Sequence, residues 1–127
     1  MPVTYVIAFD VQPGKVPVFR QLLDGVLDAM RAEANFHQAV LHRDPDSDTR
    51  FLLYETWEDH EDVLAVQLAR PYRQAWHDAL PDLLARPRAI SMWQPLRDDR
   101  RGQPAVAAPP ATARVAEPTL KVPRPTA

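Results

Sequence analysis

The chain has 127 residues, 46% of them hydrophobic, which is enough for one domain with an ordinary core. Its 15 basic residues nearly balance 17 acidic ones, so we expect neither nucleic acid nor an anionic membrane as a partner. The absence of cysteine excludes disulfides and thiolate chemistry, and no run approaches the ~18 apolar residues of a membrane span, so we expect a soluble, cytoplasmic protein.

The segment VTYVIAFDV, residues 3–11, is nearly continuous apolar and rich in β-branched and aromatic residues. This composition predicts a strand that is covered on both faces. After a Gln-Pro-Gly turn, apolar residues recur at steps of three and four, which predicts an amphipathic helix of about five turns. Pro17 fits the first turn of that helix, where its missing N–H would have no intrahelical partner. The apolar stripe consists of Val18, Phe19, Leu22, Leu23, Val26, Leu27 and Met30.

The stretch HRDPDSDTRFLLYETWED, residues 42–59, has aspartates at alternate positions and Glu55 at the twelfth place counted from Asp44, which is nearly the ligand spacing of an EF-hand calcium loop. A calcium loop also needs a glycine at the sixth place and helices on both sides, whereas Thr49 occupies that place here. We therefore predict no metal site, but a hairpin loop of residues 44–49 between strands at 36–43 and 50–57.

This hairpin loop sets an expected register for the two strands. Arg43 would face Arg50, and three further pairs would line up on one face of the sheet. These pairs are Val40 with Leu53, Gln38 with Glu55, and Phe36 with Trp57.

A second helical region follows the hairpin. Asp59 has the position of an N-cap, and Glu61 and Asp62 would lie in the first turn, where the helix dipole favours acidic residues. Pro71 begins a further helical piece that we expect Pro81 to kink or divide. A last strand is expected over residues 88–96. The order of elements predicts an α+β, ferredoxin-like βαββαβ domain over residues 1–96, with four antiparallel strands and helices on one face.

Such a sheet has a second face that the two helices do not cover. The first strand carries Ile7 and Phe9 on one face and Val6 and Ala8 on the other, and the third strand is equally apolar on both sides. An exposed apolar sheet of this size would promote aggregation. We therefore predict that a second copy packs sheet to sheet, forming a homodimeric barrel; the alternative is that the C-terminal segment folds back over its own sheet.

The C-terminal segment, residues 97–127, is rich in proline and alanine and holds six of the 14 prolines. It has six basic residues against three acidic ones, and its apolar residues show no sustained period. Such a composition is typical of a disordered or extended tail. This basic tail could also dock onto a partner protein.

The four histidines are candidate metal ligands or bases. His37 and His42 are an odd number of residues apart in one strand, so they point to opposite faces and cannot share a metal. His60 follows the predicted helix cap, which indicates a solvated surface residue. His77 follows Trp76 beside the apolar stripe of the later helix, and is either a residue at the rim of the core or a catalytic base.

Three segments resemble the antibiotic biosynthesis monooxygenase family, whose members are similar to quinol monooxygenases. These segments are VQPGK after the first strand, LHRDPDSDTRFLLYETWED across the hairpin, and RPYRQAW in the later helical region. The resemblance covers about residues 3–96. It implies a homodimeric α+β barrel with a pocket between sheet and helices in each subunit, and the oxidation of a quinol or anthrone by dioxygen with neither metal nor flavin.

That chemistry needs a base, donors that hold an anion, and an apolar cavity that excludes water. We expect His77 to be the base, with Tyr72 and Arg73 as donors. Trp57 and Trp76 are candidate walls for a flat aromatic ring. The remaining candidate substrate-binding residues are Gln38 and Glu55, which could orient a hydroxyl, and Phe36.

Two alternatives remain. The chain could be a non-enzymatic dimer that binds an aromatic ligand or docks a partner. It also resembles haem-degrading oxygenases of the same fold, whose haem ligand would fall near His77. That second match is poorer, because Gln67 and Ile7 stand where those enzymes have tryptophan and asparagine.

Overall fold

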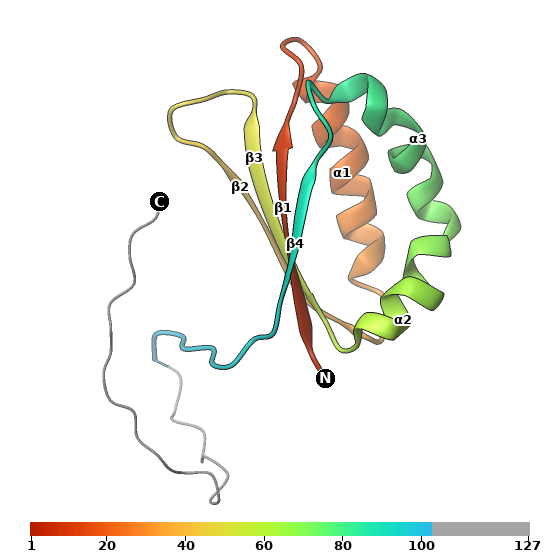
Figure 1. Ribbon diagram of the computed structural model, residues 1–127, viewed down its shortest axis with the longest axis vertical. Helices are drawn as coiled ribbons and strands as arrows, with labels where there is room; N and C mark the ends of the chain where they lie inside the picture. The colour runs from red at the N-terminus through yellow and green to blue at the C-terminus, as the bar shows by residue number, and fades with distance from the viewer. Residues whose placement is uncertain (103–127) are drawn as a thin grey trace, which may run out of the picture. The chain divides into compact units, whose positions relative to one another are not determined.

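A computed structural model describes residues 1–102, of which Met1–Leu96 form one compact unit (Figure 1). The prediction of a tail at 97–127 falls almost wholly outside the described residues. The elements of the compact unit, in chain order, are β1 (Val3–Asp10), α1 (Val16–Met30), β2 (Phe36–Arg43), β3 (Arg50–Trp57), α2 (His60–Ala65), the 3₁₀ turns η1 (Gln67–Ala69) and η2 (Pro71–Arg73), α3 (Gln74–Leu83) and β4 (Ala89–Trp93).

The strands form one antiparallel sheet in the order β2-β3-β1-β4, and the helices lie on one side of it (Figure 1). This arrangement confirms the predicted α+β, ferredoxin-like class. In β1 the burial alternates: Val3, Tyr5, Ile7 and Phe9 are buried under the helices, while the residues between them are partly exposed. Within the single chain, one face of the sheet is thus covered and the other is open.

The helices begin as the local sequence predicts. Pro17 lies in the first turn of α1, and the Asp59 side chain accepts a hydrogen bond of 3.1 Å from the backbone N–H of Asp62, which caps α2. Pro81 does not divide α3, because the helix continues to Leu83. None of the helices in the described part of the chain is long and apolar enough to cross a membrane.

The predicted hairpin register was wrong by one residue over most of its length. Arg43 pairs with Phe51, Val40 lies opposite Tyr54, Gln38 opposite Thr56, and Glu55 opposite Ala39; the pair of Phe36 and Trp57 alone is as predicted, because a bulge at the start of β2 restores it. As a result, Gln38 and Glu55 are not partners.

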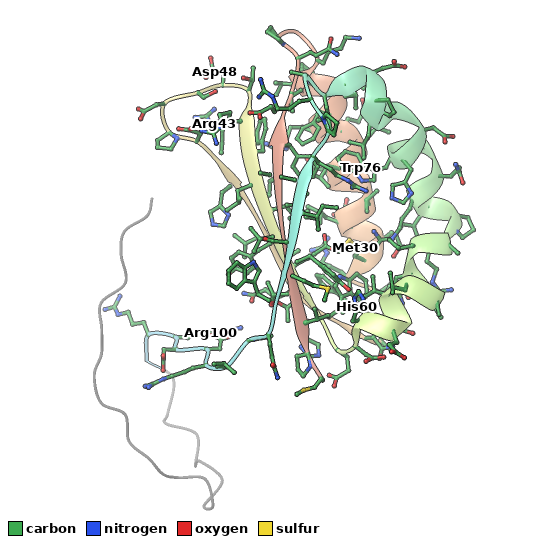
Figure 2. All side chains as sticks on the ribbon, viewed as in Figure 1. Met30, Arg43, Asp48, His60, Trp76 and Arg100 are labelled. Atoms are coloured by element: carbon green, nitrogen blue, oxygen red, sulfur yellow. The ribbon has the colours of Figure 1, made fainter. Side chains whose placement is uncertain are left out.

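The reason for the shift is that Asp44 belongs to the ladder rather than the loop. Its backbone N–H donates to the carbonyl oxygen of Arg50 at 2.9 Å, and its Oδ1 accepts from the N–H of Asp46 at 2.8 Å. Its Oδ2 accepts from Arg50 Nη1 at 2.9 Å. The carboxylate therefore stabilises a tighter turn, which lies at the end of the hairpin where Figure 2 labels Arg43 and Asp48.

An aromatic cluster at the centre of the unit joins the helices to the sheet. Phe19 of α1 lies 5.1 Å from Phe9 and 5.1 Å from Phe51, measured between ring centroids, and Trp76 of α3 lies 5.8 Å from Phe9. Rings at these separations and tilts contribute about 0.5–1.5 kcal/mol per pair beyond the burial of their area. This cluster holds α1 and α3 against one end of the sheet, and a cavity lies beside it.

Candidate active site

A cavity of about 330 Å³ lies between the helix-covered face of the sheet and the helices. Strands β1, β3 and β4 form one wall, and α1, α2 and α3 form the other. Figure 2 shows Met30 and Trp76 in the space between the two layers, with His60 at the α2 end. Most of the lining is apolar, and includes Ile7, Phe9, Leu23, Val26, Met30, Leu53 and Trp76. Volume and lining are in the range of small-molecule sites.

The polar part of the lining is small and comes from separate elements: Tyr5 of β1, Glu55 of β3, His60 of α2, Arg73 of η2, His77 of α3, Arg88 just before β4, and Ser91 of β4. The strand period brings the first two together, because Tyr5 lies opposite Glu55 in the register of β1 and β3. Both side chains therefore project toward the helices.

Glu55 is a buried carboxyl, with only 7% of the residue exposed. Its Oε1 accepts a hydrogen bond of 2.9 Å from Trp57 Nε1. Burial raises the pKa of Glu55, and this effect outweighs the Trp57 bond and the charges of Arg73 and Arg88, which all lower it. The carboxyl thus holds its proton to a higher pH than an ordinary glutamate, and in that form it can donate a hydrogen bond.

Arg73 is also buried, with 6% of the residue exposed. Its guanidinium carbon lies 5.7 Å from the ring centroid of Trp57 and 5.6 Å from that of Tyr72, both within cation–π range. Its Nε and Nη2 have no hydrogen-bond partner among residues 1–102. A buried cation with unfilled donors beside a cavity is a ready binding group for an anionic oxygen.

His77 and Arg88 complete the polar end of the cavity. Burial lowers the pKa of His77, and the charges of Arg88 and Arg73 lower it further, while Asp78 acts in the opposite direction. The imidazole is therefore neutral at neutral pH and can accept a proton. Burial likewise lowers the pKa of Arg88, whereas the charge of Glu55 raises it.

The structure places the candidate site residues in two groups. His77, Arg73, Trp76 and Glu55 line the cavity together. Tyr72 does not line it: its hydroxyl donates to Glu33 Oε2 at 3.0 Å, and burial followed by that bond raises the pKa of Tyr72.

Three other candidates are also outside the lining. Trp57 is fully buried beneath Glu55 and Arg73, so it positions polar groups rather than forming a wall. Phe36 packs edge-on against Trp57, with ring centroids 5.2 Å apart. Phe36 and Gln38 line a separate depression between β2 and α1.

Sequence reasoning missed Tyr5 and Arg88 and was wrong about His60. His60 is not a solvated surface residue: it lines the cavity, and its Nδ1 is 2.7 Å from the Tyr5 hydroxyl. The alternation of β1 could have found Tyr5, since it shares a face with Ile7 and Phe9. No local pattern could have found Arg88, because its position depends on how the loop after α3 returns to β4.

The fold and this cavity define a small α+β protein with an apolar, ligand-sized chamber and a cationic end. The family model of antibiotic biosynthesis monooxygenases matches residues 2–79, so the chain belongs to that family, as predicted. The matched range runs from β1 into α3 and includes Tyr5, Glu55, Arg73 and His77, but ends before Arg88.

Individual relatives agree with this assignment. The chain is 27% identical over 88 residues to a protein of Pestalotiopsis microspora named "Putative monooxygenase GME11364", covering 68% of this chain and 73% of the relative. Rv0793 from Mycobacterium tuberculosis has a TM-score of 0.70 at 24% identity, with coverage of 79% of this chain and 100% of that structure. SnoaB from Streptomyces nogalater, described as a cofactor-independent oxygenase, has a TM-score of 0.65 at 22% identity, with coverage of 76% and 95%. The two structural likenesses support the fold.

Proposed function

We propose that this chain is a monooxygenase that oxidises a quinol, an anthrone or a similar phenolic aromatic with dioxygen, without a metal or an organic cofactor. One observation carries the proposal. A neutral imidazole, a buried guanidinium with two unfilled donors, and a largely apolar cavity of about 330 Å³ meet at one place. These are a base, an anion-stabilising donor and an apolar chamber for the ring.

His77 acts as the general base in this proposal. It takes the acidic proton of the bound aromatic, and Arg73 and Arg88 stabilise the oxyanion that forms. Trp76 and the apolar residues around it contact the ring. Glu55, in its protonated form, donates a hydrogen bond to a substrate oxygen.

The anion then supplies the electrons for dioxygen. For an anthrone, the ionised ring transfers one electron to dioxygen, and the two radicals combine to form a carbon–oxygen bond. The imidazolium of His77 returns its proton to the peroxide. The O–O bond then breaks and the outer oxygen leaves as hydroxide, while the ring carbon loses its second hydrogen as a proton, which converts the hydroxide to water. The methylene has become a carbonyl, one oxygen atom of dioxygen is in the product, and the other is in water.

The other candidate residues have supporting roles in this proposal. Trp57 holds Glu55 through its indole N–H and lies under the guanidinium of Arg73. Tyr72 is anchored by Glu33, which also accepts from Arg70 Nη2 at 3.1 Å, and so fixes the turn that carries Arg73. Phe36 supports the Trp57 ring. The placement of Gln38 gives it no contact with the cavity, and we assign it no part in binding.

A homodimer is part of the proposal, and its support is the open face of the sheet. That face presents Val6 and Ala8 of β1, together with Leu52 of β3 and Trp93 of β4, and Trp93 is 61% exposed. A second copy packed on this face would remove these side chains from water.

Oxygen consumption tests the proposed activity. We expect the purified chain, in chelator-treated buffer, to consume dioxygen with an anthrone or with reduced menadione. His77→Gln should lower the rate by about 10²-fold or more, as expected for loss of a general base. His37→Gln is the matched control, because His37 is exposed and bonded to Glu58 away from the cavity. Binding without any turnover across a broad panel of quinols and anthrones would instead identify a ligand-binding protein.

A further inference from the structure

Arg73 has two buried N–H donors, Nε and Nη2, that lack a hydrogen-bond partner among residues 1–102. Among residues 1–102, three buried side-chain polar atoms have no hydrogen-bond partner, and two of them are Nε and Nη2 of this one residue. Leaving buried donors unfilled is costly, and more so when they carry charge. Such a group in a cavity wall indicates a ligand that fills both donors.

The geometry of the guanidinium specifies the kind of ligand. Nε and Nη2 lie on one edge of its plane, and their N–H bonds run parallel. Two parallel donors match the two oxygens of a carboxylate, and such bidentate pairs are among the strongest hydrogen-bonded contacts in proteins. A neutral hydroxyl offers one oxygen and would leave one of the two donors unfilled.

The Arg73 guanidinium is packed between aromatic rings, and in this position its Nε and Nη2 have no protein acceptor among residues 1–102. The guanidinium lies against the rings of Trp57 and Tyr72, and the Tyr72 hydroxyl is fixed by Glu33. The other carboxyl of the cavity, Glu55, has its Oε1 engaged by Trp57. Since Arg73 lines the cavity, a ligand bound there can supply the two acceptors that residues 1–102 do not.

The charge balance of the cavity also favours an anion. Arg73 and Arg88 are cations, while Glu55 is a buried carboxyl whose pKa is raised and His77 is an imidazole whose pKa is lowered. Tyr5 is a neutral phenol whose pKa is raised by burial, and His60 is bonded to its hydroxyl. The two guanidiniums outnumber the one carboxyl, so the polar end of the cavity has an excess of positive charge that an anionic ligand would reduce.

We propose that the substrate is an aromatic acid whose carboxylate is bound by the Nε and Nη2 edge of Arg73, with its ring against the apolar lining. The inference rests on the proposed function in treating the cavity as the substrate site. It goes further by assigning the Nε and Nη2 edge of Arg73 to the carboxylate, so that Arg73 selects an acid over a neutral quinol and Arg88 is the cation that stabilises the ring oxyanion of such a substrate.

Equilibrium binding tests this inference without any turnover. Isothermal titration calorimetry would compare 1-hydroxy-2-naphthoate with its neutral amide, 1-hydroxy-2-naphthamide; neither has the second ring hydroxyl of a quinol. We expect the acid to bind the full-length chain at least about tenfold more tightly than the amide, the gain typical of a charge-assisted pair. Arg73→Gln should abolish this preference, and Arg73→Lys should retain only part of it, since ammonium is not a planar fork.

Arg20→Gln is the matched control, because it removes the same charge from the exposed surface of α1, where Arg20 pairs with Asp24. It should leave the preference unchanged. Equal affinity for acid and amide, or a preference that survives Arg73→Gln, would overturn the inference. Tighter binding of a hydroxynaphthoquinone anion than of the acid would also overturn it, because Arg73 would then bind an enolate oxygen of the ring.

The two proposals can fail separately. Arg73-dependent binding of the acid with no oxygen consumption by any quinol acid would support the aromatic-acid ligand and reject the monooxygenase. Turnover of a quinol acid that is equally fast in Arg73→Gln would support the monooxygenase and reject the role of Arg73.

Discussion

Replacing Arg73 by methionine should make the ligand-free protein more stable, although Arg73 is among the most buried polar residues of the unit. Each unfilled buried donor costs about 1–3 kcal/mol. Two donors on Arg73 lack a partner among residues 1–102, so their combined cost is about 2–6 kcal/mol. The two ring contacts of the guanidinium return about 0.5–2 kcal/mol each. Methionine keeps an unbranched apolar chain of similar reach in the same space.

The midpoints of these two ranges, about 4 and about 2.5 kcal/mol, predict a gain of about 1–2 kcal/mol in the free energy of unfolding for Arg73→Met. Urea denaturation at a fixed protein concentration, followed by far-ultraviolet circular dichroism, measures this gain. In a domain of this size it corresponds to a rise of roughly 4–8 °C in Tm per kcal/mol. A saturating aromatic acid should reverse the order, because the ligand stabilises the wild-type chain and not the variant.

Arg20→Met is the control for the loss of one surface charge, and its stability should change little because Arg20 forms an exposed pair. If Arg73→Met instead lowers the free energy of unfolding by more than about 1 kcal/mol, the guanidinium is a satisfied structural group. Its two donors would then not be held in reserve for a ligand.

Three further predictions concern other parts of the site and the sheet. Because the pKa of His77 is lowered and its neutral form is the base, kcat/KM should fall only on acidification below the ordinary histidine value of about 6.5, and Arg88→Gln should move that limb to higher pH. The pKa of Glu55 is raised in the folded state, so the stability that Glu55 contributes is present below its unfolded-state pKa and is lost as the pH rises through its folded-state pKa. In urea denaturation, Glu55→Gln should therefore be more stable than wild type at pH 8 and equal to it at pH 4. Leu52→Glu places a charge on the open sheet face and should convert a dimer to a folded monomer in sedimentation velocity. Val18→Glu is the control, because Val18 is exposed on α1, and it should leave the dimer intact. A dimer that is unaffected by Leu52→Glu would place the interface elsewhere.

The Arg73 site has the character expected of a functional group that the fold tolerates at a cost. Natural proteins leave few buried polar atoms unpaired, and those that remain tend to be where ligands bind. Here the cost is reduced by two aromatic rings and by the Glu33 contacts that fix Tyr72. Stability and binding are thus coupled at this residue, and the predictions above measure the two separately.

The elements of this fold could be read from the chain because the signals are local. The alternation in residues 3–10, the three- and four-residue steps of α1, the cap at Asp59 and the turn residues after Arg43 all act within a few positions. Glu55, Arg73, Trp76 and His77 were instead named for the chemistry that the family resemblance implies, and all four line the cavity.

Which side chains share the cavity was a matter of long-range geometry. Asp44 joins the ladder instead of the loop, and this one-residue shift alone separates Gln38 from Glu55. His60 turns inward because the end of α2 meets Tyr5, 55 positions earlier in the chain. Arg88 lies in the loop between α3 and β4, whose sequence has no periodic pattern. Tyr72 turns away because Glu33, which is distant in sequence, accepts its hydroxyl. Local patterns carry no information on such contacts, because the energy of each depends on a partner that only the packed layers bring into reach.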